Sequence, residues 1–141
     1  MPARRSDDGA TWFVAFEPGV QLHEAYRAFA REQRIGAAII EAGIGMLRDP
    51  ELGFFDGQQY QRTRLRGAFE LVSTQGNVSL LDGAPFTHLH VTVAGADHVA
   101  RAGHLFEGEV HVAHEGALRA LEGVDLRRAR DPGSPLATLR W

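Results

Sequence analysis

Several stretches of the chain alternate apolar with polar or small residues, the period of two that is typical of β-strands with one buried face. This pattern predicts strands over residues 12–16, 52–55, 58–65, 69–74, 78–81, 87–93 and 109–114, and a last pair of extended segments over 124–130 and 136–141. Asp56-Gly57 is a strong hairpin signal between two of these strands. Residues 37–42 form an apolar run that predicts a buried strand. The Gly43-Ile44-Gly45 segment after it predicts a bend or a close approach of two backbones.

One stretch has the spacing of an amphipathic helix. Over residues 22–34, apolar side chains recur every three or four positions, namely Leu22, Ala25, Tyr26, Phe29 and Ala30. Strands joined by short turns outnumber this helix, so the sequence predicts an α+β fold, an antiparallel β-sheet system with one main amphipathic helix packed on it. A length of 141 residues suits a single compact domain. We assign residues 12–141 to this domain and residues 1–11 to a flexible N-terminus.

Composition limits the cellular compartments in which the protein is expected to occur. The chain has no cysteine, so it forms no disulfide and can fold in a reducing compartment. Its N-terminus lacks the apolar segment of a signal peptide, and no apolar run reaches membrane-spanning length. We therefore predict a cytoplasmic protein with no membrane partner.

The charge pattern argues against strong binding to nucleic acid. The 15 basic residues are outnumbered by 18 acidic ones, which gives a net charge of −3, whereas nucleic-acid-binding domains usually carry a basic excess. The chain has two local arginine clusters, Arg62, Arg64 and Arg66, and Arg127, Arg128 and Arg130. Such clusters can contact phosphates, but a solvated strand face is the commoner reason for a row of arginines. We expect weak, salt-sensitive DNA binding at most.

The strand predicted over residues 87–93 carries the clearest candidate site. Because side chains alternate along a strand, His88 and His90 point to one face and the apolar residues to the other. Their Cα atoms should lie about 6.5 Å apart, so two ring nitrogens can converge on one ion. His104, which follows the flexible Gly103, could supply a third nitrogen. Three histidines are the ligand set of an open zinc-type site, with a fourth position for water or a substrate.

The same histidines could instead form an ordinary solvated strand face that needs no metal. Two histidines separated by one residue occur often by chance, and their spacing leaves both interpretations open. His111 and His114 are three residues apart, so on a strand they point to opposite faces. We leave both outside the predicted ligand set.

The order of the predicted elements resembles a known protein family. The resemblance rests on a series of short segments, Glu17-Pro18-Gly19, Gly43-Ile44-Gly45, Phe69-Glu70-Leu71, Gly76-Asn77-Val78-Ser79, His88-Leu89-His90 and Gly103-His104-Leu105. In this order, within residues 12–130, they resemble the plant and prokaryote conserved domain, abbreviated PPC. Family members are compact α+β domains, generally trimeric, and in plants the domain is joined to AT-hook segments of DNA-binding proteins. The chain contains no Arg-Gly-Arg-Pro-like hook, so the minor-groove contact of the plant proteins does not carry over.

The resemblance implies a metal site and a homotrimer. Prokaryotic members hold a metal on an H-x-H pair and on the histidine of a G-G-H-L segment, which match His88, His90 and His104. Ala102 replaces the first glycine of that segment, so the local backbone is less flexible here. A homotrimer would also cover apolar and aromatic residues that a small monomer has difficulty covering, such as Phe54, Phe55 and Trp141.

Two classes of function remain open for this site. The first is a trimeric binding or regulatory module, described in the family as DNA-binding, whose zinc is structural or senses a small-molecule ligand. The second is a metal-dependent hydrolase or lyase, in which Glu70 is the general base for a metal-activated water and Asn77 is an orienting group. Glu70 could equally accept a hydrogen bond from a ligand imidazole and fix its tautomer. We favour the first class, because no nucleophile elbow, phosphate loop or paired-carboxylate signature accompanies the histidines.

Overall fold

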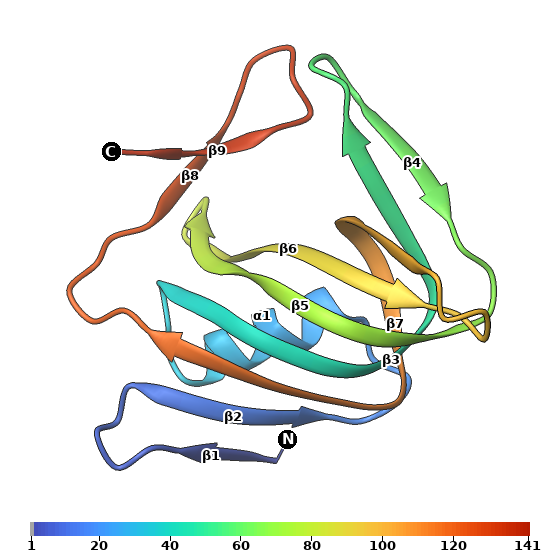
Figure 1. Cartoon of the computed structure of the whole chain (residues 1–141). Helices are drawn as coiled ribbons and strands as arrows, with labels where there is room; N and C mark the ends of the chain where they lie inside the picture. The colour runs from blue at the N-terminus through green and yellow to red at the C-terminus, as the bar shows by residue number, and fades with distance from the viewer. Residues whose placement is uncertain (1) are drawn as a thin grey trace.

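The computed structural model describes residues 2–141, which form nine strands and one helix. In chain order the elements are β1 (Ala3–Arg5), β2 (Thr11–Phe16), α1 (Leu22–Glu32), β3 (Ala38–Phe55), β4 (Tyr60–Arg64), β5 (Ala68–Leu81), β6 (Ala84–Ala94), β7 (Ala100–Ala120), β8 (Arg127–Arg130) and β9 (Ala137–Arg140). The strands form one sheet in the order β1-β2-β7-β3-β5-β8-β9 (Figure 1). In addition, β4 pairs with β3, and β6 pairs with both β5 and β7, so that β3, β5, β6 and β7 close into a ring. The predicted α+β fold with a single packed helix is confirmed.

The core lies between α1 and the sheet, because the apolar stripe of the helix packs against β6 and β7. All five residues of the predicted stripe are buried, namely Leu22, Ala25, Tyr26, Phe29 and Ala30. From the sheet, Leu89, Val93 and Leu105 are fully buried on the facing side. The helix ends at Glu32, two residues before the predicted end, since Arg34 has a left-handed φ of 56° that an α-helix cannot contain.

Strand β3 is one strand of 18 residues where the sequence predicts two strands and a bend. Its pairing with β7 shifts register at several points, so the strand curves without ending. Gly45 lies at one of these points with a φ of 148°, and a Cβ there would lie 2.1 Å from the carbonyl oxygen of Ala113. The predicted close approach of two backbones is therefore confirmed.

The N-terminal boundary differs from the predicted one. Ala3–Arg5 form β1, which pairs antiparallel with β2 and places Ala3 opposite Val14. The Nε–H of Arg5 also donates to the carbonyl oxygen of Gly9, at 2.7 Å. Secondary structure thus begins at Ala3 and not at residue 12. A three-residue strand with two arginines has no apolar alternation, and its backbone hydrogen bonds leave no mark in the sequence.

Two hairpins project above β6, one on each side (Figure 1). The β3–β4 hairpin turns at the predicted Asp56-Gly57, where the Asp56 carboxylate accepts hydrogen bonds from the backbone N–H groups of Gln58 and Gln59. The β8–β9 hairpin is attached through β8, which runs parallel to β5 and is the one parallel strand among residues 2–141. The sequence predicts both C-terminal strands but not this partner, because parallel pairs join segments that are distant in the chain.

Candidate metal centre

Three histidines meet above strand β6. On this strand Leu89 is fully buried and Val91 is 3% exposed, so its apolar side faces the core as predicted. His88 and His90 project from the opposite side, where His88 is half-buried and His90 is exposed. His104 lies on β7, directly opposite His90 in the pairing of β6 with β7. The structure therefore brings all three predicted ligands together.

His104 is held by a regular strand and not by a flexible loop. The register of β6 and β7 runs unbroken through Ala102, so the alanine that replaces the family glycine does not disturb it. A glycine is needed at position 103 for close strand packing, and not for the flexibility that the sequence predicts. A Cβ at this position would lie 2.9 Å from the carbonyl oxygen of Gly53, so the glycine permits the close approach of β7 and β3. This close packing fixes the backbone beside His104.

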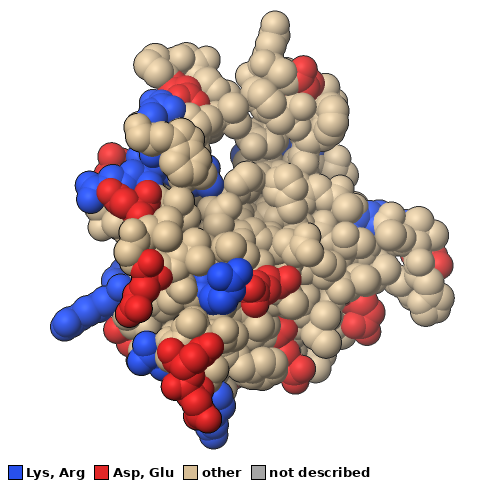
Figure 2. Space-filling model, turned by 60° about the vertical axis from the view of Figure 1, so that its left-hand side comes forward, with Lys and Arg blue, Asp and Glu red and all other residues tan. Residues whose placement is uncertain are grey.

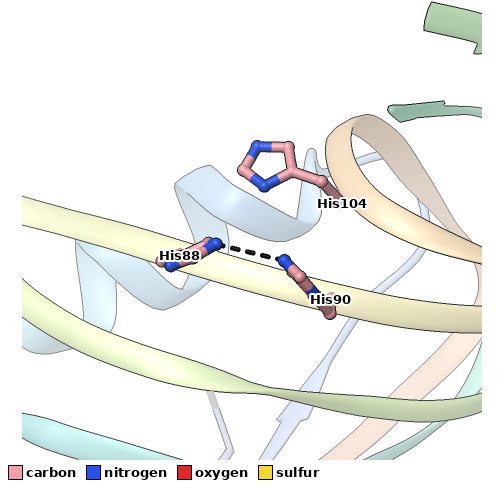
Figure 3. A group of neighbouring side chains, drawn as sticks. All are labelled: His88, His90 and His104. Atoms are coloured by element: carbon pink, nitrogen blue, oxygen red, sulfur yellow. Dashed lines mark hydrogen bonds between the residues drawn. The ribbon is translucent and has the colours of Figure 1, made fainter. Parts of the chain in front are cut away.

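The ring nitrogens of the three side chains converge on one another. The Nε2 atoms of His88 and His90 lie 3.2 Å apart, and each histidine offers a nitrogen within 4.8 Å of the others. Figure 3 shows the ring of His104 above the other two, with one nitrogen turned towards them. Two nitrogens bound to one tetrahedral zinc ion, each at 2.0–2.1 Å, lie about 3.3 Å apart. The first pair thus has the spacing of two ligands of the same ion.

Protonation and hydrogen bonding also fit a metal. Burial lowers the pKa of His88 and of His104 to about 4, and charge repulsion from the neighbouring histidines acts in the same direction. Both rings are therefore neutral at pH 7, which is the form that binds a metal ion. The Nδ1 atom of His104 is buried and has no hydrogen-bond partner in the described part of the chain. Buried polar atoms are rarely left unpaired, and a metal ion would satisfy this one.

Glu70, predicted as a general base or a hydrogen-bond acceptor for a ligand, is not brought to the site. It is exposed and lies opposite Ala94, four residues along β6 from His90. At about 3.3 Å per residue this is a separation of about 13 Å along the strand. The sequence predicts the strand that contains Glu70 but not its register against β6, and the register decides the distance.

Asn77 lies closer, directly opposite His88 in the pairing of β5 with β6. Its side-chain oxygen is already engaged, because it accepts a hydrogen bond of 3.0 Å from Arg128 of β8. Asn77 therefore positions Arg128 next to the histidines. The parallel pairing of β8 with β5 creates this contact, and nothing in the local sequence signals it.

A cavity of about 400 Å³ adjoins the histidines. His88 and His104 form part of its lining, and the rest comes from α1, β4, β6, β7, β8, β9 and the loop before β9. Figure 2 shows the surface indented between the two upper projections of the molecule. Sequence reasoning missed this cavity, because its walls come from elements spread over the whole chain.

His23, from the first turn of α1, is a further histidine in the lining of the cavity. Burial lowers its pKa to about 4, so the ring is neutral at pH 7. Its Nε2–H donates to the carbonyl oxygen of Leu105, and its Nδ1 accepts from the hydroxyl of Thr87, both at 2.7 Å. These partners are the chain neighbours of His104 and His88, so His23 positions the backbone on both sides of the site. Its place in an amphipathic helix gave no sign of this role.

The comparisons with known proteins agree with the fold. The family model of the Plants and Prokaryotes Conserved domain, abbreviated PCC or PPC, matches residues 3–122. The chain belongs to this family. The PPC protein of Pyrococcus horikoshii is 36% identical, each chain covers 92% of the other, and the TM-score is 0.83. A metal-containing protein of Archaeoglobus fulgidus is 31% identical, with 94% of each chain covered and a TM-score of 0.84.

A third solved structure, from Bacteroides thetaiotaomicron, is 26% identical to this PPC protein and is provisionally named a DNA-binding protein. It covers 98% of this chain, 96% of its own chain is covered, and the TM-score is 0.84. No curated protein matches the sequence. The family match begins at residue 3, where β1 also begins, and it confirms the resemblance seen in the sequence.

Two of the three arginines in the first cluster of this PPC protein, Arg62 and Arg64, are paired with carboxylates of the chain. Arg62 and Arg64 both form ion pairs with Glu51, and Arg64 also pairs with Glu107. On the face drawn in Figure 2, basic and acidic side chains are interspersed and do not gather by sign. Within residues 2–141, no helix has the length and apolar character that crossing a bilayer requires.

Proposed function

We propose that this PPC protein holds one divalent metal ion, zinc, on His88, His90 and His104. The observation that carries the proposal is the convergence of three ring nitrogens within 4.8 Å of one another. Imidazole nitrogens suit zinc among the divalent ions, and three of them leave a fourth position open. An ion held there supplies a Lewis acid and a positive charge to the molecule that takes this position. The metal-containing Archaeoglobus fulgidus protein supports the proposal.

We place the protein among binding or regulatory modules. A hydrolase or lyase that uses a metal-activated water needs a general base beside the metal. Glu70, the candidate for this role, lies about 13 Å away along the strand. The residues that line the adjoining cavity include no aspartate or glutamate. The cavity, at about 400 Å³, has the size of a small-molecule site.

DNA binding enters this proposal only as a weak activity. The relative from Bacteroides thetaiotaomicron carries a provisional DNA-binding name. In this chain the net charge is −3, and Arg62 and Arg64 are paired with carboxylates. Seven of the 15 arginines pair with carboxylates in this net-acidic chain, so few phosphate contacts are expected and the affinity should be modest and sensitive to salt.

We propose further that the protein is a homotrimer. Apolar side chains at Ile44, Phe54, Val112 and Trp141 are between 55% and 99% exposed. Phe55, named with Phe54 in the sequence prediction, is half-buried against Tyr60. Association would remove the exposed apolar surface from water. Light scattering should give the mass of three chains, and a monomer at micromolar concentration would contradict the proposal.

The test of the metal site is the zinc content of untagged protein, purified in the presence of zinc without a nickel column. We expect one zinc ion per chain in the wild type and, in His90→Ala, no more than about a tenth of that amount, because one of three protein ligands is lost. His98→Asn is the matched control, since His98 is exposed with a φ of 60°, a conformation that asparagine tolerates. Equal zinc in the wild type and in His90→Ala would overturn the proposal.

A further inference from the structure

The cavity beside the histidines carries a second set of polar groups. Three arginines line it, Arg27 from α1 and Arg128 and Arg130 from β8. The guanidinium carbons of Arg27 and Arg128 lie 5.8 Å and 5.3 Å from the centre of the same ring, that of Phe86. Two positive charges are thus held around one aromatic side chain in a hollow without an acidic residue in its lining.

Neither Arg27 nor Arg128 has a carboxylate within 4 Å in the described residues, where eight other arginine–carboxylate contacts occur. The Nε–H of Arg27 donates to the hydroxyl of Thr87 at 3.2 Å. Arg128 donates to the side-chain oxygens of Asn77 and Ser79. These neutral acceptors orient the two guanidinium groups but leave their charges without a counter-ion.

Burial adds to the need for a counter-ion. Loss of water lowers the pKa of both Arg27 and Arg128 below the usual range of an arginine. Glu24 acts in the opposite direction on Arg27, but its carboxylate is largely exposed and pairs with Arg31. An oxyanion in the cavity would compensate these two half-buried charges, and the planar guanidinium fork matches a carboxylate or a phosphate.

The wall next to the histidines is aromatic. Tyr60 and Phe106 pack edge to face with ring centres 4.8 Å apart. Both rings also lie against His104, at 4.9 Å and 4.7 Å between centres. Such a wall suits the apolar part of a ligand.

We propose that the cavity binds a small organic anion, whose carboxylate or phosphate group is held by Arg27 and Arg128 and whose apolar body lies against the aromatic wall beside the three histidines. The inference deepens the proposed function and rests on it only for the metal at the histidine end. Arg27 and Arg128 belong to the site whether or not the metal is present.

The experiment uses two probes with the same ring and different anionic groups, benzoate and phenylphosphate, and benzyl alcohol as the uncharged counterpart. Each is titrated by calorimetry into full-length protein, both zinc-loaded and zinc-free. Backbone NMR shifts in the wild type should locate the bound anion at Phe86 and Thr87. The tighter of the two anions identifies the carboxylate or the phosphate class, and benzyl alcohol should bind at least about tenfold more weakly than that anion.

Matched variants separate the cavity from the rest of the basic surface. We expect Arg27→Gln to weaken binding of the anion about tenfold or more, since it removes a charge-assisted hydrogen-bond donor. Arg31→Gln, one turn along α1 on the exposed side, should stay within about twofold of the wild type. Arg128→Gln and its exposed neighbour Arg127→Gln form a second pair with the same expectation. Because Arg128 also contacts Asn77 and Ser79, Arg27→Gln is the deciding variant.

The outcomes distinguish this inference from the metal proposal. The inference is overturned if neither anion binds zinc-loaded protein at millimolar concentration, or if Arg27→Gln binds them as the wild type does. Binding that depends on Arg27 in protein that takes up no zinc would support the anion site and refute the metal site. Zinc uptake without anion binding would support the metal site and refute the anion site.

Discussion

Histidine side chains lie in two contrasting regions of this protein, one beside a cavity and one enclosed in the core. Above β6, His88, His90 and His104 face one another at the edge of a cavity. Inside the sheet, His114 is fully buried, and its Nε2 lies 2.8 Å from the hydroxyl of Tyr26. Both regions contain a buried Nδ1 atom without a partner in the described chain, at His104 and at His114. An unpaired nitrogen alone therefore does not indicate a metal site. His104 differs from His114 because ring nitrogens of His88 and His90 lie within 4.8 Å of its own.

The surroundings of His114 show why that region cannot take a ligand. Its ring stacks on Phe16, with ring centres 5.5 Å apart. A Cβ on Gly43 would lie 2.6 Å from its Cε1 atom, and a Cβ on Gly116 would lie 2.4 Å from the hydroxyl of Tyr26. Gly43 on the paired strand β3 and Gly116 on β7 itself thus leave the space that the imidazole and the Tyr26 hydroxyl fill. His114 therefore serves packing, whereas the ring nitrogens of His88, His90 and His104 remain free to bind.

The largest expected effect concerns this packing. Gly43→Ala would place a methyl group against the His114 ring and against Thr74, both fully buried, so neither can move aside. We expect the free energy of unfolding to fall by about 3 kcal/mol. Gly36→Ala is the control, because its Cβ would meet only the side chain of Leu80, at 3.5 Å or more. Urea denaturation measures both.

A double variant sharpens the same test. If the loss in Gly43→Ala comes from the imidazole, His114→Ala in the same chain should recover part of it, because the methyl then enters vacated space. A loss in Gly43→Ala no larger than in Gly36→Ala would show that the core around His114 is loosely packed and would remove the contrast between the two regions.

The second expected effect is a dependence of stability on pH. Burial lowers the pKa of His114 from 6.5 to about 4 in the folded protein, while the unfolded chain keeps the ordinary value. Above pH 6.5 the His114 ring is neutral in both the folded and the unfolded state. As the pH falls from 6.5 towards 4, only the unfolded state takes up the proton, so the folded state loses about 3 kcal/mol of stability from this group. Below pH 4 this contribution is constant.

Denaturation of zinc-free protein at pH 7, 5.5 and 4 measures this dependence. Burial also lowers the pKa of His23, His88 and His104 to about 4, so these groups act in the same direction in zinc-free protein. His114→Asn has no titrating group at this position, so its stability should fall less between pH 7 and pH 4 than that of the wild type. An identical fall in both proteins would mean that His114 is not kept neutral by burial.

The third expected effect isolates one hydrogen bond. Tyr26→Phe removes the hydroxyl that bonds His114 and leaves a second buried ring nitrogen unpaired, which should cost about 1 to 2 kcal/mol. Tyr60→Phe is the control, since the Tyr60 hydroxyl makes no hydrogen bond to a side chain of residues 2–141.

The smallest expected effect concerns the histidines beside the cavity. His90→Ala should change the stability of zinc-free protein by less than about 0.5 kcal/mol, because His90 is exposed. A larger loss there would contradict the division between packing and binding histidines.

The sequence alone determined the features that depend on local periodicity. Alternation along residues 87–93 placed His88 and His90 opposite the buried Leu89 and Val91, because the side chains of any strand alternate. Apolar spacing of three and four likewise placed the α1 stripe in the core. The ordered short segments were sufficient to identify the family, which the match over residues 3–122 confirms.

Only the tertiary structure decided which residues from different strands meet. The register of β6 against β7 sets His104 opposite His90, and the register of β5 against β6 keeps Glu70 about 13 Å away. The parallel pairing of β8 with β5 brings Arg128 to the cavity that Arg27 also lines. Side-chain direction repeats every two residues along a strand, so the pattern predicts which face a residue lies on but not which residue of the neighbouring strand lies opposite it. Register depends on bulges and contacts between distant segments, and these form only when the whole chain packs.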